Sequence, residues 1–260
     1  MSALAAMSLS QTAIAEVDDA DVDNPAGTTI SGTGYGVKLD AGGPYTIDNA
    51  GEISAEQNTF SYGIYVLPPI TVTSINNTPT GVIKGNAIGG GADRGRGIFA
   101  SGGSIGTLIN AGLISGIADS DFGVGIFLES NSSVGTITNS GTITASAVED
   151  DAFGIRISSA SSVGTLTNSG LISASAVSGA YGIDIHTSTV TTLNNSGTIS
   201  LNATATVGSS SSMTGIHVFN TSSVNNLINS GLISLSISGV VETSFQKAGA
   251  IRVSDASTVT

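Results

Sequence analysis

The sequence predicts an all-β fold, a right-handed parallel β-helix, and three observations support it. A short string built around an asparagine recurs seven times, at spacings of 27 to 34 residues. Between the copies, apolar and polar residues alternate with period 2, as they do in half-buried strands. No window of comparable length has the period of 3.6 that an amphipathic helix would show. Repeats of this length are typical of solenoids, and the crossover rule for parallel strands favours a right-handed coil.

The composition agrees with this class and excludes several others. Of 260 residues, 40% are hydrophobic and only 10% are charged, against roughly 25% charged in ordinary domains. The chain has no cysteine, which excludes a disulfide scaffold and thiol catalysis. No apolar run reaches the roughly 18 residues of a membrane-spanning helix. The net charge of −12 argues against nucleic acid as a partner.

The N-terminal residues read as an export signal followed by an acidic leader. Residues 1–15 resemble the end of a signal peptide, and the small residues around Ile14 predict cleavage between Ala15 and Glu16. Residues 16–28 are rich in aspartate, but they lack the glycine and the closing glutamate of a calcium-binding loop. We expect a solvated leader there. The repeat domain is predicted to cover residues 29–260 and to be truncated within a repeat, as a fragment of a longer chain.

The corner string is clearest in the copy LTNSGLIS, which begins at Leu166. Asparagine tolerates left-handed backbone angles and bonds its own backbone in turns, and stacked amides bond along a column. We therefore expect structural columns rather than ligands at these corners. The asparagine column is predicted at Asn49, Asn77, Asn110, Asn139, Asn168, Asn195 and Asn229. The corner glycines are Gly51, Gly81, Gly112, Gly141, Gly170, Gly197 and Gly231.

Each repeat contains three short strands, as in residues 163–168, 171–175 and 181–185. This organisation predicts about eight rungs of 27–35 residues, stacked about 4.8 Å apart over about 38 Å. Equivalent aliphatic positions then form inward columns that begin at Val37, Leu39, Ile47 and Ile53. One rung buries too little apolar surface to fold alone, so stacking is required.

The asparagine–glycine corner and the repeated Gly-Ile-x-Ile/Val strand resemble the passenger region of bacterial autotransporters, a pertactin-like right-handed β-helix. The resemblance covers roughly residues 29–260. It implies export to the cell surface or exterior of a Gram-negative bacterium, with an outer-membrane translocator barrel outside this fragment. It also implies a structural or adhesive rod whose partner is a surface glycan or protein of a host or neighbouring cell.

The search for chemistry gives no convincing catalytic constellation, and we expect neither a cofactor nor a metal. The main alternative is a β-helical carbohydrate-active enzyme or tailspike-like module. Such an enzyme needs two carboxylates about 5–9.5 Å apart, and the loop residues Asp119, Asp121, Asp150 and Asp151 are its candidates. His186 and His217 lie on adjacent rungs, but no third metal ligand is indicated. A further alternative is a self-assembling filament subunit.

An outward aromatic strip is the remaining candidate for function. Tyr65, Phe99 and Phe127 occupy the outward position of three consecutive Gly-Ile-x-Ile/Val strands. Exposed contiguous aromatic side chains often mark interaction sites. The strip is therefore a candidate contact surface, and the alternative is lateral packing beneath the loop of residues 84–96 or against a neighbouring chain.

Overall fold

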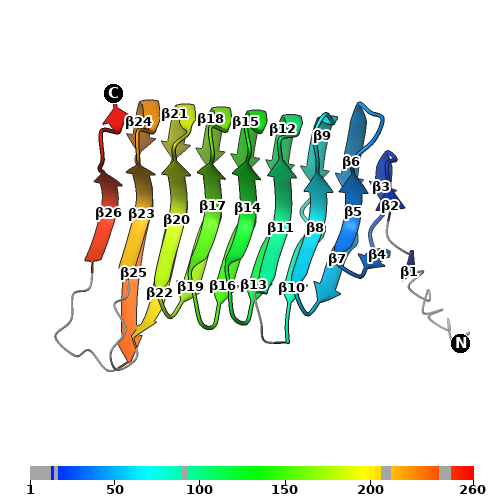
Figure 1. The fold of residues 1–260 in the computed structure, drawn as a ribbon, viewed down its shortest axis with the longest axis horizontal. Helices are drawn as coiled ribbons and strands as arrows, with labels where there is room; N and C mark the ends of the chain where they lie inside the picture. The colour runs from blue at the N-terminus through cyan, green and yellow to red at the C-terminus, as the bar shows by residue number, and fades with distance from the viewer. Residues whose placement is uncertain (1–12, 15–16, 90–92, 206–211, 240–246) are drawn as a thin grey trace, which may run out of the picture.

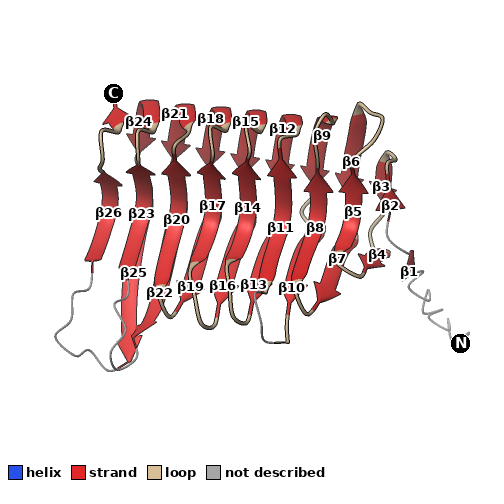
Figure 2. Ribbon diagram, in the orientation of Figure 1, coloured by secondary structure: helices blue, strands red, loops and turns tan. Residues whose placement is uncertain are grey.

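The computed structural model describes residues 13–14, 17–89, 93–205, 212–239 and 247–260. Within these ranges every regular element is a β-strand (Figure 2). The strands form three parallel sheets of nine strands each, and every turn of the chain adds one strand to each sheet. The turns succeed one another along the long axis of the molecule (Figure 1). The fold is the predicted right-handed parallel β-solenoid with three strands per rung.

The three sheets are named A, B and C in the order in which the chain enters them. Sheet A consists of β1 (Ala13–Ile14), β4 (Thr29–Gly32), β7 (Glu52–Gln57), β10 (Val82–Ala87), β13 (Leu113–Ala118), β16 (Thr142–Ala147), β19 (Leu171–Ala176), β22 (Thr198–Ala205) and β25 (Leu232–Gly239). Sheet B consists of β2 (Val17–Asp18), β5 (Tyr35–Leu39), β8 (Phe60–Val66), β11 (Arg94–Ser101), β14 (Gly123–Glu129), β17 (Ala152–Ser158), β20 (Gly179–His186), β23 (Ser212–Phe219) and β26 (Lys247–Val253). Sheet C consists of β3 (Val22–Asn24), β6 (Tyr45–Asn49), β9 (Thr71–Asn77), β12 (Ser104–Asn110), β15 (Ser133–Asn139), β18 (Ser162–Asn168), β21 (Thr189–Asn195), β24 (Ser223–Asn229) and β27 (Thr258–Val259).

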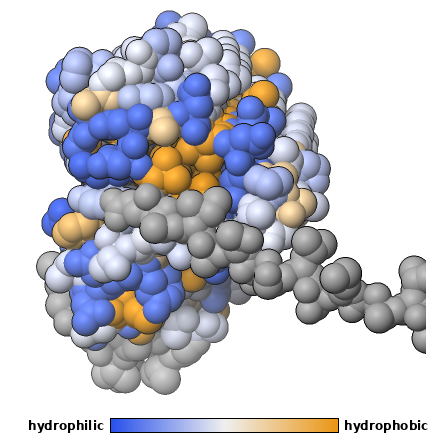
Figure 3. Space-filling model, turned by 90° about the vertical axis from the view of Figure 1, so that its right-hand side faces the viewer, coloured by the Kyte–Doolittle hydropathy of each residue, from blue (hydrophilic) through white to orange (hydrophobic). Residues whose placement is uncertain are grey.

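The aliphatic columns fill the interior of the coil. The columns that begin at Val37, Leu39, Ile47 and Ile53 are completely buried through their middle rungs, and equivalent residues are direct partners in the strand register. Seen from the end that carries β3 and β4, apolar residues gather in the centre and hydrophilic residues surround them (Figure 3). Burial is lower on β26, the edge strand of sheet B, where Ile251 and Val253 are each 42% exposed.

The asparagine column is a continuous hydrogen-bonded ladder. In each step the Nδ2 group of one asparagine donates to the Oδ1 atom of the asparagine on the next rung, at 2.6 to 2.8 Å. The backbone groups of the corner join the same stack. For example, the amides of Ser140 and Gly141 both donate to the carbonyl of Asn110. Every corner is thereby fixed to the corner before it.

The backbone at this corner differs from the prediction. Left-handed angles occur instead at the turn between sheets B and C, as in Ser130 (φ 59°) and Asn131 (φ 64°). The ladder asparagines are therefore required for their stacked amides and not for a left-handed conformation. The corner glycines are required by close packing, because a Cβ atom on Gly141 would lie 2.2 Å from the carbonyl oxygen of Gly112.

The predicted boundary at Thr29 lies inside the stack, so the acidic leader needs correction. Strands β2 and β3 pair with β5 and β6, and Asn24 donates to Asn49 as the first member of the ladder. Residues 22–24 thus repeat residues 47–49. Sequence comparison missed this copy because, as in the copy at residues 75–77, extra residues separate the asparagine from the following strand. The predicted cleavage site at Ala15 and Glu16 lies outside the described residues.

The glycine of the Gly-Ile-x-Ile/Val strand gives a first test of rung packing. A Cβ atom on Gly154 would lie 2.3 Å from Cγ2 of Ile172 and 2.7 Å from the carbonyl oxygen of Gly182. We expect Gly154→Ala to lower the free energy of unfolding by about 1–3 kcal/mol, as overpacking does. Gly249→Ala on the edge strand β26 is the control, since no atom of the described residues lies within 4 Å of its Cβ position. Urea denaturation measures the stability of both variants, and equal unfolding midpoints for the two would contradict this packing.

Candidate functional site

The outer face of sheet B carries a row of stacked rings. Tyr35, Tyr65, Phe99 and Phe127, here called the aromatic row, come from β5, β8, β11 and β14. Their ring centroids follow one another at 5.3, 4.9 and 5.4 Å, and the planes are tilted by only 4° to 21°. Tyr65, Phe99 and Phe127 stack because in-register strands place equivalent side chains one rung apart, and Tyr35 reaches Tyr65 from the position that pairs with Tyr62.

The aromatic row is not the exposed strip that was one of the two predictions. Phe99 is 4% exposed and Phe127 is 6% exposed. The reason is Arg96, whose guanidinium carbon lies 3.9 Å from the Phe99 ring centroid and 4.5 Å from that of Phe127. Burial lowers the pKa of Arg96 and raises the pKa of Tyr65 to about 12. The rings pack against one another and beneath Arg96, which lies on the same strand as Phe99.

A small pocket lies further along the same face. It has a volume of about 160 Å³. The side chains around it come from β17, β20 and β23 and from the residue before β17, and we call the site the polar pocket. Its lining residues are Asp151, Phe153, Arg156, Tyr181, Asp184, His186, His217 and Phe219.

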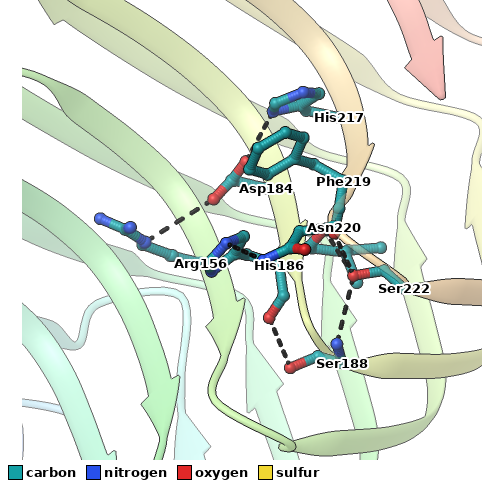
Figure 4. A network of polar contacts seen from close by, with 9 residues as sticks. Arg156, Asp184, His186, Ser188, His217, Phe219, Asn220 and Ser222 are labelled. Atoms are coloured by element: carbon teal, nitrogen blue, oxygen red, sulfur yellow. Dashed lines mark hydrogen bonds and ion pairs between the residues drawn. The ribbon is translucent and has the colours of Figure 1, made fainter. Parts of the chain in front are cut away.

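The centre of the polar pocket is the Asp184 carboxylate, which is 5% exposed. His217 Nδ1 donates to one of its oxygens at 2.9 Å, and Arg156 Nε lies 3.6 Å from the other (Figure 4). These three residues occupy the same outward position of β17, β20 and β23, where Arg156 is paired with Asp184 and Asp184 with His217. Burial of a carboxylate is tolerated here because it is paired with a cation and hydrogen-bonded.

Aromatic rings form the walls of the polar pocket. The Phe153 and Tyr181 rings stack at 4.9 Å with a tilt of 10°. The Phe219 ring stacks on His217 and on His186, each at 5.2 Å. The His186 ring is held from the side by Asn220, whose Nδ2 atom lies 3.1 Å from its Nε2 atom (Figure 4).

Asp151 is the group in the pocket with the most altered acidity. Burial raises its pKa to about 6, the neighbouring Asp150 and Asp184 charges act in the same direction, and Arg156 opposes them. Burial also raises the pKa of Tyr181. A Cβ atom on Gly179 would lie 2.5 Å from Asp151 Oδ1 and 2.7 Å from Tyr181 Cε2. The glycine therefore allows both groups to approach the backbone of β20.

The raised pKa gives a second test, in which Asp151→Asn changes the pH dependence of stability. The folded protein holds the Asp151 proton more tightly than the unfolded chain, so stability falls as pH rises from about 4 to about 6. Asparagine does not titrate, and we expect the variant to be more stable than the parent at pH 7.5 by about 1–2 kcal/mol. Urea denaturation from pH 4 to 7.5 measures this, with Glu149→Gln as the exposed control. An unchanged slope between pH 4 and 6 in Asp151→Asn would contradict the assignment.

The acidic residues that were candidates for catalysis differ in their contacts. Asp119 accepts a hydrogen bond from the Gly89 amide, and Asp121 forms an ion pair with Arg94 at 2.8 Å. Only Asp151 lines the polar pocket. Arg156, Asp184 and His217 follow Phe127 at the outward position of successive Gly-Ile-x-Ile/Val strands, and sequence reasoning did not predict that they bond to one another. The sequence signal for these contacts was the alternation of basic and acidic residues at the same position of successive repeats.

Comparison with protein-family models, with curated proteins and with solved structures finds no match for this chain. In the part of the chain that the structure describes, no helix has the length and apolar character needed to cross a membrane.

Proposed function

We propose that this chain is a segment of an exported surface rod, similar to an autotransporter passenger, which presents the outer face of sheet B for contact. The repeat resemblance supports export, and the cysteine-free sequence is compatible with passage of an unfolded chain across the outer membrane. In this proposal the solenoid acts as a rigid spacer. It holds side chains at intervals of about 4.8 Å along its axis.

The observation that carries the proposal is the unbroken ladder of seven amide hydrogen bonds from Asn24 to Asn229. Each rung contacts mainly its neighbours, as in other solenoids, so folding can propagate from one rung to the next. Such a chain folds as it emerges from a secretion channel and becomes a straight, rigid projection.

Localisation on cells tests the proposal. Antibodies raised against the folded protein are expected to label intact cells of the bacterium that makes it, and external protease is expected to remove the signal. A periplasmic protein is the control and should be labelled only in permeabilised cells. Labelling of this chain only after permeabilisation would contradict surface display.

A further inference from the structure

The polar pocket has the dimensions of a single-ring ligand. Pockets for drug-sized molecules usually measure about 300–1,000 Å³, and this one measures about 160 Å³. A larger hollow of about 400 Å³ lies on sheet A, but its lining has no aromatic residue and includes the Glu52–Lys84 ion pair. The polar pocket is thus the better candidate for selective binding.

The walls of the pocket suit a ligand with one flat apolar face. Phe153 and Tyr181 present two nearly parallel rings, and Phe219 lies on the other side of His217. Aromatic side chains combine a large apolar surface with a low entropy cost of ordering. These rings cover one another's faces, so the wall consists of ring edges, and the C–H groups of a sugar ring pack against these apolar edges.

Polar atoms in the pocket lack partners within the described protein. His217 is 8% exposed, and its Nε2 atom has no hydrogen-bond partner among the described residues. The Nε–H group of Arg156 is likewise unpartnered, because 3.6 Å to Asp184 is too long for a hydrogen bond. Asp151 lines the pocket and is only partly buried. The accessible polar group of the pocket is therefore the Asp151 carboxylate, which accepts hydrogen bonds from ligand hydroxyl groups.

The charges around the pocket disfavour anionic ligands. The Asp151 and Asp184 carboxylates outnumber the single Arg156 guanidinium, which is itself paired with Asp184. Hydroxyl groups both donate and accept hydrogen bonds, and they carry no charge. We propose that the polar pocket binds one neutral pyranose unit of a glycan. This inference rests on the proposed function, since it names the chemistry that the presented face of sheet B recognises.

Glycan binding by purified protein tests the inference. The protein is applied at pH 7.5 to an array of neutral, sialylated and uronate-containing glycans, and the affinity for a bound neutral glycan is then measured by titration calorimetry. We expect neutral glycans to bind, and Tyr181→Ala and Asp151→Ala to weaken binding at least tenfold. Tyr65→Ala is the matched control, because it removes a ring from the same face outside the pocket, and its affinity should match that of the parent.

Three outcomes would overturn the inference: no binding of neutral glycans by the folded protein, binding of charged glycans only, or unchanged affinity in folded Tyr181→Ala. Circular dichroism of each variant verifies that it is folded. Failure here remains distinct from failure of the proposed function. Surface labelling without glycan binding would contradict only the pocket assignment. Glycan binding by a chain that never reaches the surface would contradict only the proposed surface display.

Discussion

Ile172→Asp is expected to abolish cooperative folding of the solenoid. Ile172 is completely buried, its register partners are Ile143 and Ile199, and its Cγ2 atom lies against the backbone of Gly154. An unpaired carboxylate at this position has no described cation to pair with, and uncompensated burial of charge costs at least about 3–5 kcal/mol. That loss is a large fraction of the about 5–15 kcal/mol that stabilises ordinary domains.

The neighbouring residue provides the control for this substitution. Ser173 follows Ile172 on β19 but is only partly buried on the outer face. We expect Ser173→Asp to change the free energy of unfolding by less than about 0.5 kcal/mol, as surface substitutions usually do. Thermal unfolding followed by circular dichroism compares the two variants. A melting temperature of Ile172→Asp equal to that of Ser173→Asp would contradict the inward column.

Asn139→Asp is expected to destabilise the protein strongly at neutral pH and much less in acid. The amide Nδ2 of Asn139 donates to Asn168 Oδ1 at 2.7 Å and to the Leu171 carbonyl at 3.1 Å, while its Oδ1 atom accepts from Asn110. A carboxylate keeps the acceptor and loses both donors, so two buried acceptors lose their partner. Each such loss costs about 1–3 kcal/mol, which gives about 2–6 kcal/mol before the burial of charge is added.

The pH dependence distinguishes this mechanism from simple damage to the corner. Burial raises the pKa of the introduced carboxyl above its ordinary value, so the variant is most stable when this group is protonated and loses stability as pH rises through that pKa. Asn194→Asp, on the partly buried outer side of β21, should show neither effect. Denaturation of both variants at pH 3.5 and 7.5 measures the difference. If Asn139→Asp lowered the free energy of unfolding equally at both pH values, the result would contradict the role of the ladder donor.

The repeat allowed most of the fold to be predicted, because a solenoid converts sequence period directly into spatial register. The inward columns, the asparagine column and the three strands per rung all follow from aligned copies. The N-terminal copy around Asn24 escaped notice because extra residues follow its asparagine. Small inward residues of sheet A such as Ala145 and Ala174, which are 1% and 0% exposed, were also missed, since alanine carries little periodic signal.

The candidate site was harder to predict, because it depends on directions of side chains across the sheet. Alignment placed Phe99 and Phe127 on the outer face correctly. It did not reveal that Arg96, three residues before Phe99 on the same strand, covers both rings. Similarly, an outward column that contains Arg156, Asp184 and His217 gives no distances between their side chains, and the ion pair and the hydrogen bond emerge only in three dimensions.

The central claim is that successive rungs stack in register as one rigid rod, and distance measurement between spin labels tests it most directly. The chain has no cysteine, so pairs introduced at outward positions of sheet C report without interference. Asp48 and Asn194 are separated by five register steps, and Ile228 lies one step beyond Asn194. With steps of about 4.8 Å, the account predicts narrow distance distributions near 24 Å for Asp48→Cys with Asn194→Cys and near 29 Å for Asp48→Cys with Ile228→Cys. Broad distributions, or a second distance no longer than the first, would contradict the stacked rod.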